Sequence, residues 1–170
     1  MGTGKPGRNL NTRGNGRKIS DFALVHSDEG TLIWSYKPLN RLRMMSGGHG
    51  QKGMDLLDRH GIKYNIVKTY SNGVRVGHVP DHGTKAKRSG IPQSWFPRNW
   101  TDRTIRRAGE YVASLKANRN APNGKIMFGV YRRVRVGVIK TNGKIATVFP
   151  DSDQTSLPKL KKFRRRRNRK

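Results

Sequence analysis

The chain is 170 residues long and strongly basic: 37 lysines and arginines stand against 10 acidic residues, the formal net charge is +27, and there is no cysteine. Disulfide bonds and thiolate metal sites are therefore excluded, and the length suits one domain with tails. Lysine and arginine side chains that neutralise phosphates release condensed counterions, so this charge favours binding to a nucleic acid. Solubility alone does not require so one-sided a balance, and an anionic membrane surface would require a long amphipathic helix that the sequence lacks.

The basic residues are concentrated toward both ends. Residues 1–19 carry five and no acidic residue, residues 159–170 carry nine and no acidic residue, and the middle keeps 23 together with all 10 acidic residues, a charge of +13. The composition predicts a disordered basic linker at residues 1–20, typical of a module joined to a longer protein, and a basic tail at residues 152–170. No signal peptide and no apolar run near the ~20 residues of a membrane span is present, so we expect a soluble chain.

We predict that residues 21–45 form a connecting segment. Apolar stretches at residues 22–25 and 31–36 flank the turn-like residues 27–30, which allows a hairpin there. A glycine-dense turn at residues 46–50 leads into a short helix at residues 51–59, with Met54 and Leu57 toward a core. Residues 62–68 and 74–76 then flank Asn72-Gly73, which predicts a hairpin with a type I′ turn because both residues tolerate a positive φ.

The second half predicts one helix and three strands. Residues 80–98 contain three prolines and no hydrophobic period, so we expect a long irregular loop of functional importance. Thr101 is a good N-cap for a helix that ends near residues 116–118, and its apolar residues recur on one face: Ile105, Ala108, Val112 and Leu115. We predict strands at residues 126–131, 134–140 and 144–149. Asn142-Gly143 would join the last two as a hairpin. The predicted fold class is α+β, with antiparallel hairpins packed around a central helix.

Five histidines can transfer protons near neutral pH, and two of them stand out. His49 lies among glycines, where the backbone can approach a ligand closely, and His82 opens the loop that carries Lys85, Lys87 and Arg88. The spacing of His78 and His82 suits a zinc pair on a helix, but Pro80 argues against a helix and no third ligand is near, so we expect no metal site.

The remaining candidates have plainer interpretations. His60 sits near a helix end and suits a partner of the helix dipole, and His26 suits a strand or turn. Trp95, Phe96 and Trp100 lie in the basic loop, where aromatic rings can stack single-stranded bases. For at least two of the three we favour a different interpretation, in which the aromatic rings anchor the loop to the core.

The ordered set of local motifs resembles the bacterial EndoU-type nuclease domains found at the C-termini of polymorphic and contact-dependent toxins. The resemblance covers residues 46–151 and rests on these segments: residues 46–53, 64–68, 72–77, 79–82, 85–90, 93–97 and 143–151. The resemblance implies an endoribonuclease that needs no metal, although Mn²⁺ can stimulate such enzymes. It also implies products with 2′,3′-cyclic phosphate and 5′-hydroxyl ends. A histidine pair, a lysine and a late-strand hydroxyl would perform this reaction through the 2′-OH of RNA.

By position, the resemblance assigns the catalytic set to His49, His82, Lys87 and Thr147, with Lys85 as the alternative lysine and His78 as a rival for either histidine. Phe149 stands where related enzymes often have tyrosine; it can stack a base but cannot donate a hydrogen bond. The other residues expected to bind substrate are Lys85, Arg88, Ser94 and Trp95.

The resemblance also implies a monomeric toxin module that is secreted or delivered into the cytoplasm of a target cell. An immunity protein would then block its cleft, and the charge of the toxin favours an acidic inhibitor. The alternative function is a basic protein that binds RNA or DNA without cleaving it.

Overall fold

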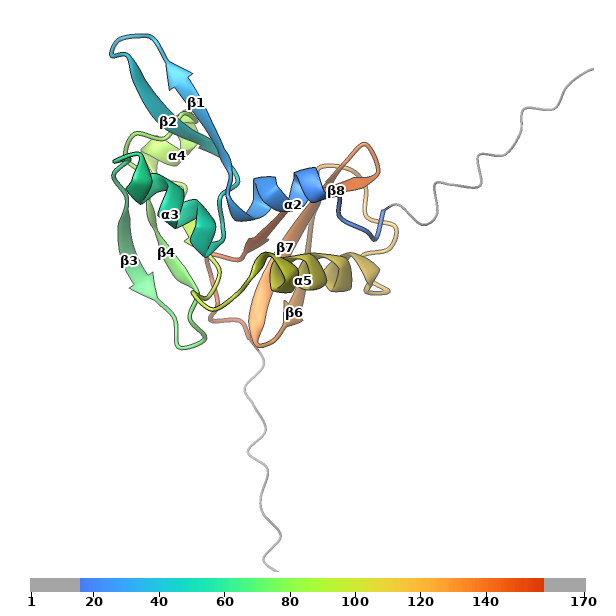
Figure 1. Cartoon of the computed structure of the whole chain (residues 1–170). Helices are drawn as coiled ribbons and strands as arrows, with labels where there is room; N and C mark the ends of the chain where they lie inside the picture. The colour runs from blue at the N-terminus through green and yellow to red at the C-terminus, as the bar shows by residue number, and fades with distance from the viewer. Residues whose placement is uncertain (1–15, 158–170) are drawn as a thin grey trace, which may run out of the picture.

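A computed structural model describes residues 16–157 (Figure 1). The predicted α+β class is confirmed: this part of the chain contains four helices and eight strands, and the strands form three antiparallel sheets. The first half contains α2 (Asp21–Asp28), β1 (Thr31–Ser35), β2 (Arg41–Ser46), α3 (Gln51–Arg59), β3 (Asn65–Thr69) and β4 (Arg75–His78). The second half contains α4 (Lys85–Ser89), β5 (Gln93–Trp95), α5 (Asp102–Ser114), β6 (Ile126–Tyr131), β7 (Val134–Thr141) and β8 (Lys144–Pro150).

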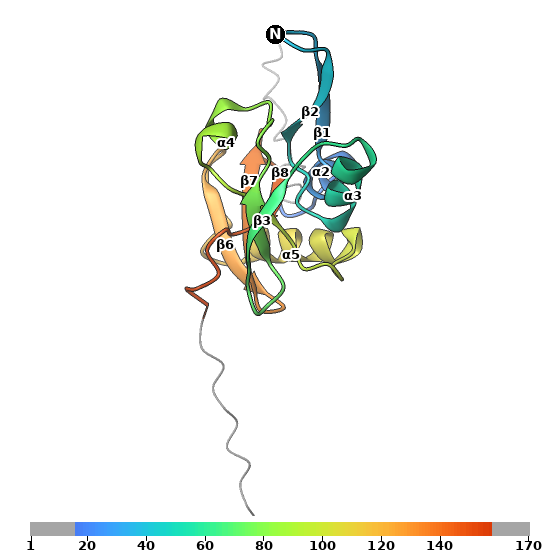
Figure 2. The ribbon, with the colours of Figure 1, turned by 90° about the vertical axis from the view of Figure 1, so that its left-hand side faces the viewer.

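The strands pair in the orders β1-β2, β3-β4-β5 and β6-β7-β8. Helix α5 lies across one face of the β6-β7-β8 sheet, and α2 lies beside β8 (Figure 1). The turned view separates α4 from α5, with the strands between them (Figure 2). None of the helices in residues 16–157 is long and apolar enough to cross a membrane.

Two hydrophobic cores hold these layers together. The larger core joins α2 and α5 to the β6-β7-β8 sheet, and the predicted helix face contributes Ile105, Ala108 and Val112, all fully buried. Leu115 is only partly buried, because α5 ends at Ser114 and not at residues 116–118. The smaller core lies between α3 and the first two sheets, where Met54 and Leu57 are buried as predicted. Thr101 caps α5 by accepting a hydrogen bond from the backbone N–H of Thr104.

A β-bulge in β8 determines which side chains face the core. Ile139 pairs with Thr147 and Lys140 pairs with Ile145, so Ala146 is the extra residue. Side chains alternate between the two faces of a regular strand, and a bulge resets that alternation. Ile145 and Val148 consequently both enter the larger core. Thr147 and Phe149 are partly exposed and line a cavity on the opposite face of the sheet.

Several local predictions were wrong. Residues 22–25 are not a strand: they belong to helix α2, and the hairpin in residues 21–45 is formed by β1 and β2. The linker predicted to be disordered at residues 1–20 includes Ile19, which is 4% exposed and forms a β-bridge to Ile145. Residues 1–15 of that linker and residues 158–170 of the predicted tail lie outside the described residues. Residues 80–98 are not wholly irregular, because they contain α4 and β5.

The two Asn-Gly turns differ. Asn142 and Gly143 both have a positive φ, as a type I′ turn requires. At the first turn only Gly73 has a positive φ, and its N–H donates to the carbonyl of Tyr70. That hairpin is therefore a β-turn followed by a glycine bulge and not the predicted type I′ turn.

Ser27 connects α2 to the edge strand β8 and provides a test of this packing. Its fully buried hydroxyl donates to the carbonyl of Ala23 and accepts from the N–H of Val148 at 3.0 Å. We expect Ser27→Ala to lower the free energy of unfolding by about 1–3 kcal/mol, because the Val148 N–H loses its partner inside the protein. Urea unfolding measures this, with Ser89→Ala on exposed α4 as the control. Equal free energies of unfolding for Ser27→Ala and Ser89→Ala would show that the Ser27 hydroxyl does not stabilise the packing of α2 on β8.

Candidate active site

The loop that carries His49 is held by the C-terminal end of α2. The last carbonyls of a helix have no partners within it. Here the carbonyls of His26, Ser27 and Asp28 accept hydrogen bonds from three consecutive N–H groups, those of Gly48, His49 and Gly50. Gly47 makes the approach possible: its φ is +66°, and a Cβ there would lie 2.0 Å from the carbonyl oxygen of His26. A short helix therefore fixes the backbone of His49.

The ring of His49 is buried and has a defined tautomer. Its Nδ1 lies 2.8 Å from the carbonyl oxygen of Ser94, which can only accept, so Nδ1 carries the hydrogen. Burial lowers the pKa of His49 to about 3, and Lys87 contributes in the same direction. At neutral pH the ring is consequently uncharged, with an unprotonated Nε2 that can accept a proton.

His82 has the opposite tautomer. The N–H of Thr84 donates to its Nδ1 at 2.9 Å, so the hydrogen of the neutral ring lies on Nε2. Burial lowers its pKa to about 4, and the cations Lys87, Arg43 and Arg88 lower it further. His82 is 2% exposed in this conformation.

Strand β2 brings the two histidines together. It runs directly into the His49 loop, and its other residues hold the His82 loop. The N–H of Gly83 donates to the carbonyl of Met44 at 2.7 Å, and Nη2 of Arg43 donates to the carbonyl of His82 at 2.9 Å. His82 is among the groups that lower the pKa of His49, so its ring is near enough to influence the charge of His49.

Lys87, and not Lys85, is the lysine of this region. Its Nζ donates to the carbonyl of Pro92 at 2.8 Å and to Oε1 of Gln93 at 3.3 Å. Burial lowers its pKa, and its charge lowers the pKa of both histidines. Lys85 is exposed and has no hydrogen bond or ion pair to any residue in 16–157.

Gln93 is a site residue that the sequence analysis missed. It is 2% exposed; its Oε1 accepts from Lys87, and its Nε2 donates to the carbonyl of Gly47 at 2.9 Å. It therefore ties the lysine to the histidine loop. The one sequence signal for Gln93 was its place in residues 93–97, a segment that carries the family resemblance. A polar residue on a three-residue strand is too short a pattern to show the alternation of a β-strand.

A cavity of about 350 Å³ lies beside these groups. His49, Lys87, Thr147 and Phe149 all line it, together with apolar residues of β6 and β7. The rings of His49 and Phe149 lie 5.7 Å apart, tilted by 43°. His82 lies outside the lining. With Ser94, five of the predicted site residues thus share one cavity, and the bulge in β8 turns two of them toward it.

Other predicted site residues have different surroundings. The prediction that Trp95 binds substrate was wrong, because its side chain is 0% exposed and belongs to the smaller core. Phe96 and Trp100 are also buried, as the anchoring interpretation expected. Ser94 lines the cavity, but its hydroxyl already donates to the carbonyl of Pro150, and its own carbonyl orients His49. Exposed Arg88 donates to the carbonyls of His82 and Gly83.

The other histidines differ in position. His26 lies in helix α2, and not in the strand or turn that the sequence suggested, and its charge lowers the pKa of His49. His60 is the C-cap of α3, as its dipole interpretation expected. His78 ends β4, where its N–H donates to the side chain of Asn65. No group of three or more histidine, aspartate or glutamate side chains in residues 16–157 is arranged to hold a metal ion.

The charge around the histidines is positive. Two carboxylates lie at the site, and both are paired: Asp81 with Arg41 and Arg43, and Asp151, which lines the histidine cavity, with Arg135. Lys87 and Arg88 have only neutral hydrogen-bond partners in the described residues. These two cations beside two neutral imidazoles favour binding of an anion such as a phosphodiester.

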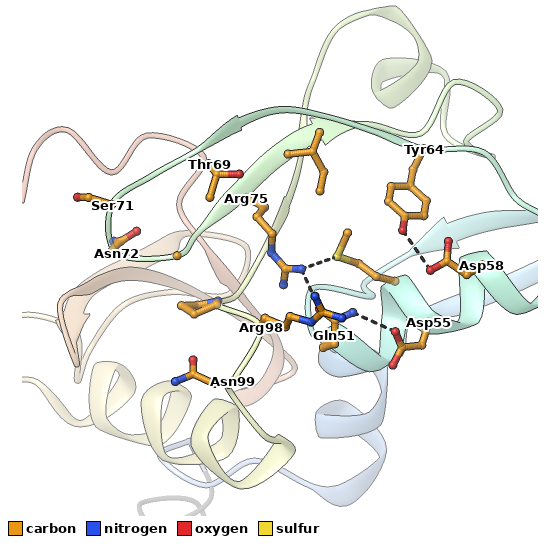
Figure 3. Close-up of a pocket in the computed structure, with 14 residues that line it drawn as sticks. Gln51, Asp55, Asp58, Tyr64, Thr69, Ser71, Asn72, Arg75, Arg98 and Asn99 are labelled. Atoms are coloured by element: carbon orange, nitrogen blue, oxygen red, sulfur yellow. Dashed lines mark hydrogen bonds between the residues drawn. The ribbon is translucent and has the colours of Figure 1, made fainter.

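A larger cavity, of about 660 Å³, is a different one (Figure 3). It lies between α3 and the β3–β4 hairpin and contains no histidine. Arg75 crosses its floor and donates through Nη1 to Oε1 of Gln51, while Tyr64 donates to Asp58 (Figure 3). Mixed charges and the lack of a proton-transfer pair make it a poorer candidate than the smaller histidine cavity.

The depressed histidine pKa values predict acid sensitivity. His49 and His82 bind protons less readily when folded than at the ordinary value of 6.5, so the unfolded chain takes up more protons below that pH. Asp28 opposes this trend, since burial raises its pKa to about 6. His26, whose pKa burial also lowers, acts in the same direction as His49 and His82. With three histidines against Asp28, we expect the unfolding temperature to fall as pH drops from 7 to 4.5. Calorimetry should show a weaker pH dependence for His82→Asn; a wild-type unfolding temperature that rises with acidification would refute the prediction.

The comparison with protein families identifies the family of the chain. The family described as bacterial EndoU nuclease matches residues 32–152, well over half of the chain. The match starts inside the segment that the sequence analysis treated as a connection, so it includes the β1–β2 hairpin. No curated protein and no solved structure matches the chain. On the family match, the chain belongs to the bacterial EndoU nucleases.

Proposed function

We propose that this nuclease is an endoribonuclease that leaves 2′,3′-cyclic phosphate and 5′-hydroxyl ends. The observation that carries the proposal is the unprotonated Nε2 of His49, which can accept a proton and lines the same cavity as Lys87; His82 supplies the acid once its ring has bound a second proton. One base and one acid are what cleavage through the 2′-OH requires.

The reaction balances with these groups alone. Nε2 of His49 takes the proton of the 2′-OH, and the 2′-oxygen forms a bond to phosphorus. The bond between phosphorus and the 5′-oxygen breaks, and this oxygen takes a proton from His82 in its imidazolium form, which leaves the neutral imidazole ring. Lys87 stabilises the negative charge that develops on the non-bridging oxygens. Thr147 contacts the phosphate or base from the cavity wall, and Phe149 stacks on the base.

Two adjustments accompany substrate binding in this proposal. The first is a local movement that opens access to the ring of His82, because His82 is 2% exposed, while Lys87 remains at the cavity. The second is a rise in the pKa of His82, because a bound phosphodiester anion opposes the cations that lower it.

Incubation of the protein with RNA in EDTA tests the activity, with Mn²⁺ added in a parallel reaction for stimulation. We expect cyclic-phosphate ends in both reactions and no cleavage of the same sequence carrying 2′-deoxy residues, which lack the nucleophile. Absence of cyclic-phosphate products in both reactions would overturn the proposal.

The biological role that we propose is that of a toxin module delivered into the cytoplasm of a target cell as a monomer, as the family resemblance implies. Residues 16–157 carry 25 basic and 10 acidic residues, so an acidic immunity protein is the expected inhibitor. Expression of the protein without an inhibitor should stop growth of a bacterial host, and His49→Asn should restore it.

A second candidate function is RNA or DNA binding without cleavage, which the positive charge and the buried His82 favour. Binding that depends steeply on salt, yields no product and is unchanged by His49→Asn would select this function instead.

A further inference from the structure

A second basic cavity lies on the other face of the β6-β7-β8 sheet. Its volume is about 470 Å³. Ile139 lines the histidine cavity and the next residue, Lys140, lines this one, and neighbouring side chains on a strand point to opposite faces. The lining consists of Gly16, Arg17, Arg119, Asn120, Ala121, Asn123, Lys140 and Gly143.

Lys140 is the unusual residue of this cavity. It is 6% exposed, and no hydrogen bond or ion pair joins its ammonium group to another residue in 16–157. Its Nζ lies near the cavity, 3.4 Å from the position that a Cβ on Gly16 would take. Lysine is rarely buried without a partner, because removing a charge from water is unfavourable unless another group compensates it. An anion in the cavity would compensate it.

The other polar groups of the cavity suit an anion as well. Arg17 and Arg119 add two guanidinium groups, Asn120 and Asn123 add amides, and no carboxylate belongs to the lining. Arg119 uses Nε to reach the carbonyl of Ser114, and its two terminal nitrogens have no hydrogen bond to any residue in 16–157. Two guanidinium groups and a lysine are typical of a phosphate site.

We infer that this cavity binds a phosphate group and that its source is the backbone of an RNA whose scissile bond occupies the histidine cavity. The choice of RNA rests on the proposed function; the binding of phosphate itself does not. Both cavities lie at the same end of the sheet, since Ile126 lines the first and Asn123 lines the second. Exposed Lys125 and Lys144 lie at that end of β6 and β8, where a strand of RNA would cross from one face to the other.

The first experiment measures binding of an uncleavable RNA, 2′-fluoro at every position, so that its result does not depend on catalysis. We expect Lys140→Met to weaken binding about tenfold, as loss of one charge-assisted hydrogen bond does, and to reduce the slope of log affinity against log salt by about 1. Lys63→Met is the matched control, because Lys63 is an exposed lysine in the segment between α3 and β3.

The second experiment separates this cavity from the site of cleavage. A dinucleotide has one phosphodiester, the scissile one, and therefore no phosphate for the second cavity. We expect Lys140→Met to raise KM for long RNA about tenfold and to leave the cleavage of a dinucleotide unchanged. Equal losses on both substrates would mean that Lys140 acts only through the fold, and would overturn the inference.

A third measurement distinguishes the sources of phosphate. Inorganic phosphate should shift the backbone amide resonances of Lys140 and Gly143, and long RNA should displace it. Phosphate binding without displacement by RNA would keep the phosphate site and overturn RNA as its source. If Lys140→Met fails to fold, Arg119→Gln replaces it, because Arg119 is exposed. Unchanged RNA affinity and no phosphate shifts would overturn the inference altogether.

Discussion

Replacing His49 with asparagine is expected to lower the rate of RNA cleavage by about 10²–10⁴-fold, the range for loss of a general base. The amide nitrogen of asparagine can replace Nδ1 in the hydrogen bond to the carbonyl of Ser94, so the loop keeps its main contact. The substitution removes only the unprotonated Nε2. Single-turnover cleavage of a labelled RNA measures the effect, and unfolding temperatures check the fold.

His82→Asn should give a loss of similar size, since the amide oxygen can accept from Thr84 in place of Nδ1 while the proton donor is gone. His78→Asn is the matched control and should retain wild-type activity, because His78 lies at the end of β4 and lines neither basic cavity. A fully active His49→Asn or His82→Asn variant would refute the site. Loss of activity in His78→Asn alone would make His78 the true partner.

Replacing Lys87 with methionine is expected to slow cleavage by about 10²–10³-fold, comparable to the loss of one group that stabilises a developing oxyanion. Methionine keeps the length of the apolar stem and removes the ammonium group that contacts Pro92 and Gln93. The loss should fall on kcat more than on KM, because the charge on the non-bridging oxygens is greatest in the transition state. Steady-state kinetics on a short RNA separate the two constants.

The same substitution has a second signature. Lys87 lowers the pKa of both histidines, so Lys87→Met should raise both pKa values, and titration of the ring resonances by NMR detects this. Lys85→Met is the control, since Lys85 is exposed and has no partner in residues 16–157. If Lys85→Met is the inactive variant and Lys87→Met the active one, the assignment of the lysine is reversed.

Elements with strong local signals were predictable from the sequence. Helix α5 has an N-cap and an apolar face, α3 follows a glycine-dense turn, and β7 and β8 flank an Asn-Gly turn. Helix α2 was not predictable, because its eight residues place apolar Phe22 and Val25 in solvent and bury polar Ser27 and Asp28. Tertiary contacts with β8 and α5 stabilise it, and these cannot be read from its own sequence.

The site was predictable in part for the same reason. His49, Lys87, Thr147 and Phe149 were located by the family resemblance, and they share one cavity. Gln93 was missed, since a buried hydrogen bond between distant loops leaves no trace in spacing. Trp95 was misassigned because an aromatic ring in a basic loop gives the same sequence signal whether it stacks on bases or fills a core.

The hydrogen bonds between α2 and the His49 loop bear on how such a domain can be exchanged between proteins. A recombination junction placed between Gly30 and Gly47 would transfer both histidines, the lysine and the cavity, yet leave behind the helix that fixes His49. The recipient would inherit every reactive group and still position one of them poorly. Productive shuffling of this nuclease therefore requires a breakpoint before Ile19, whose side chain is the first in the described residues to enter the larger core.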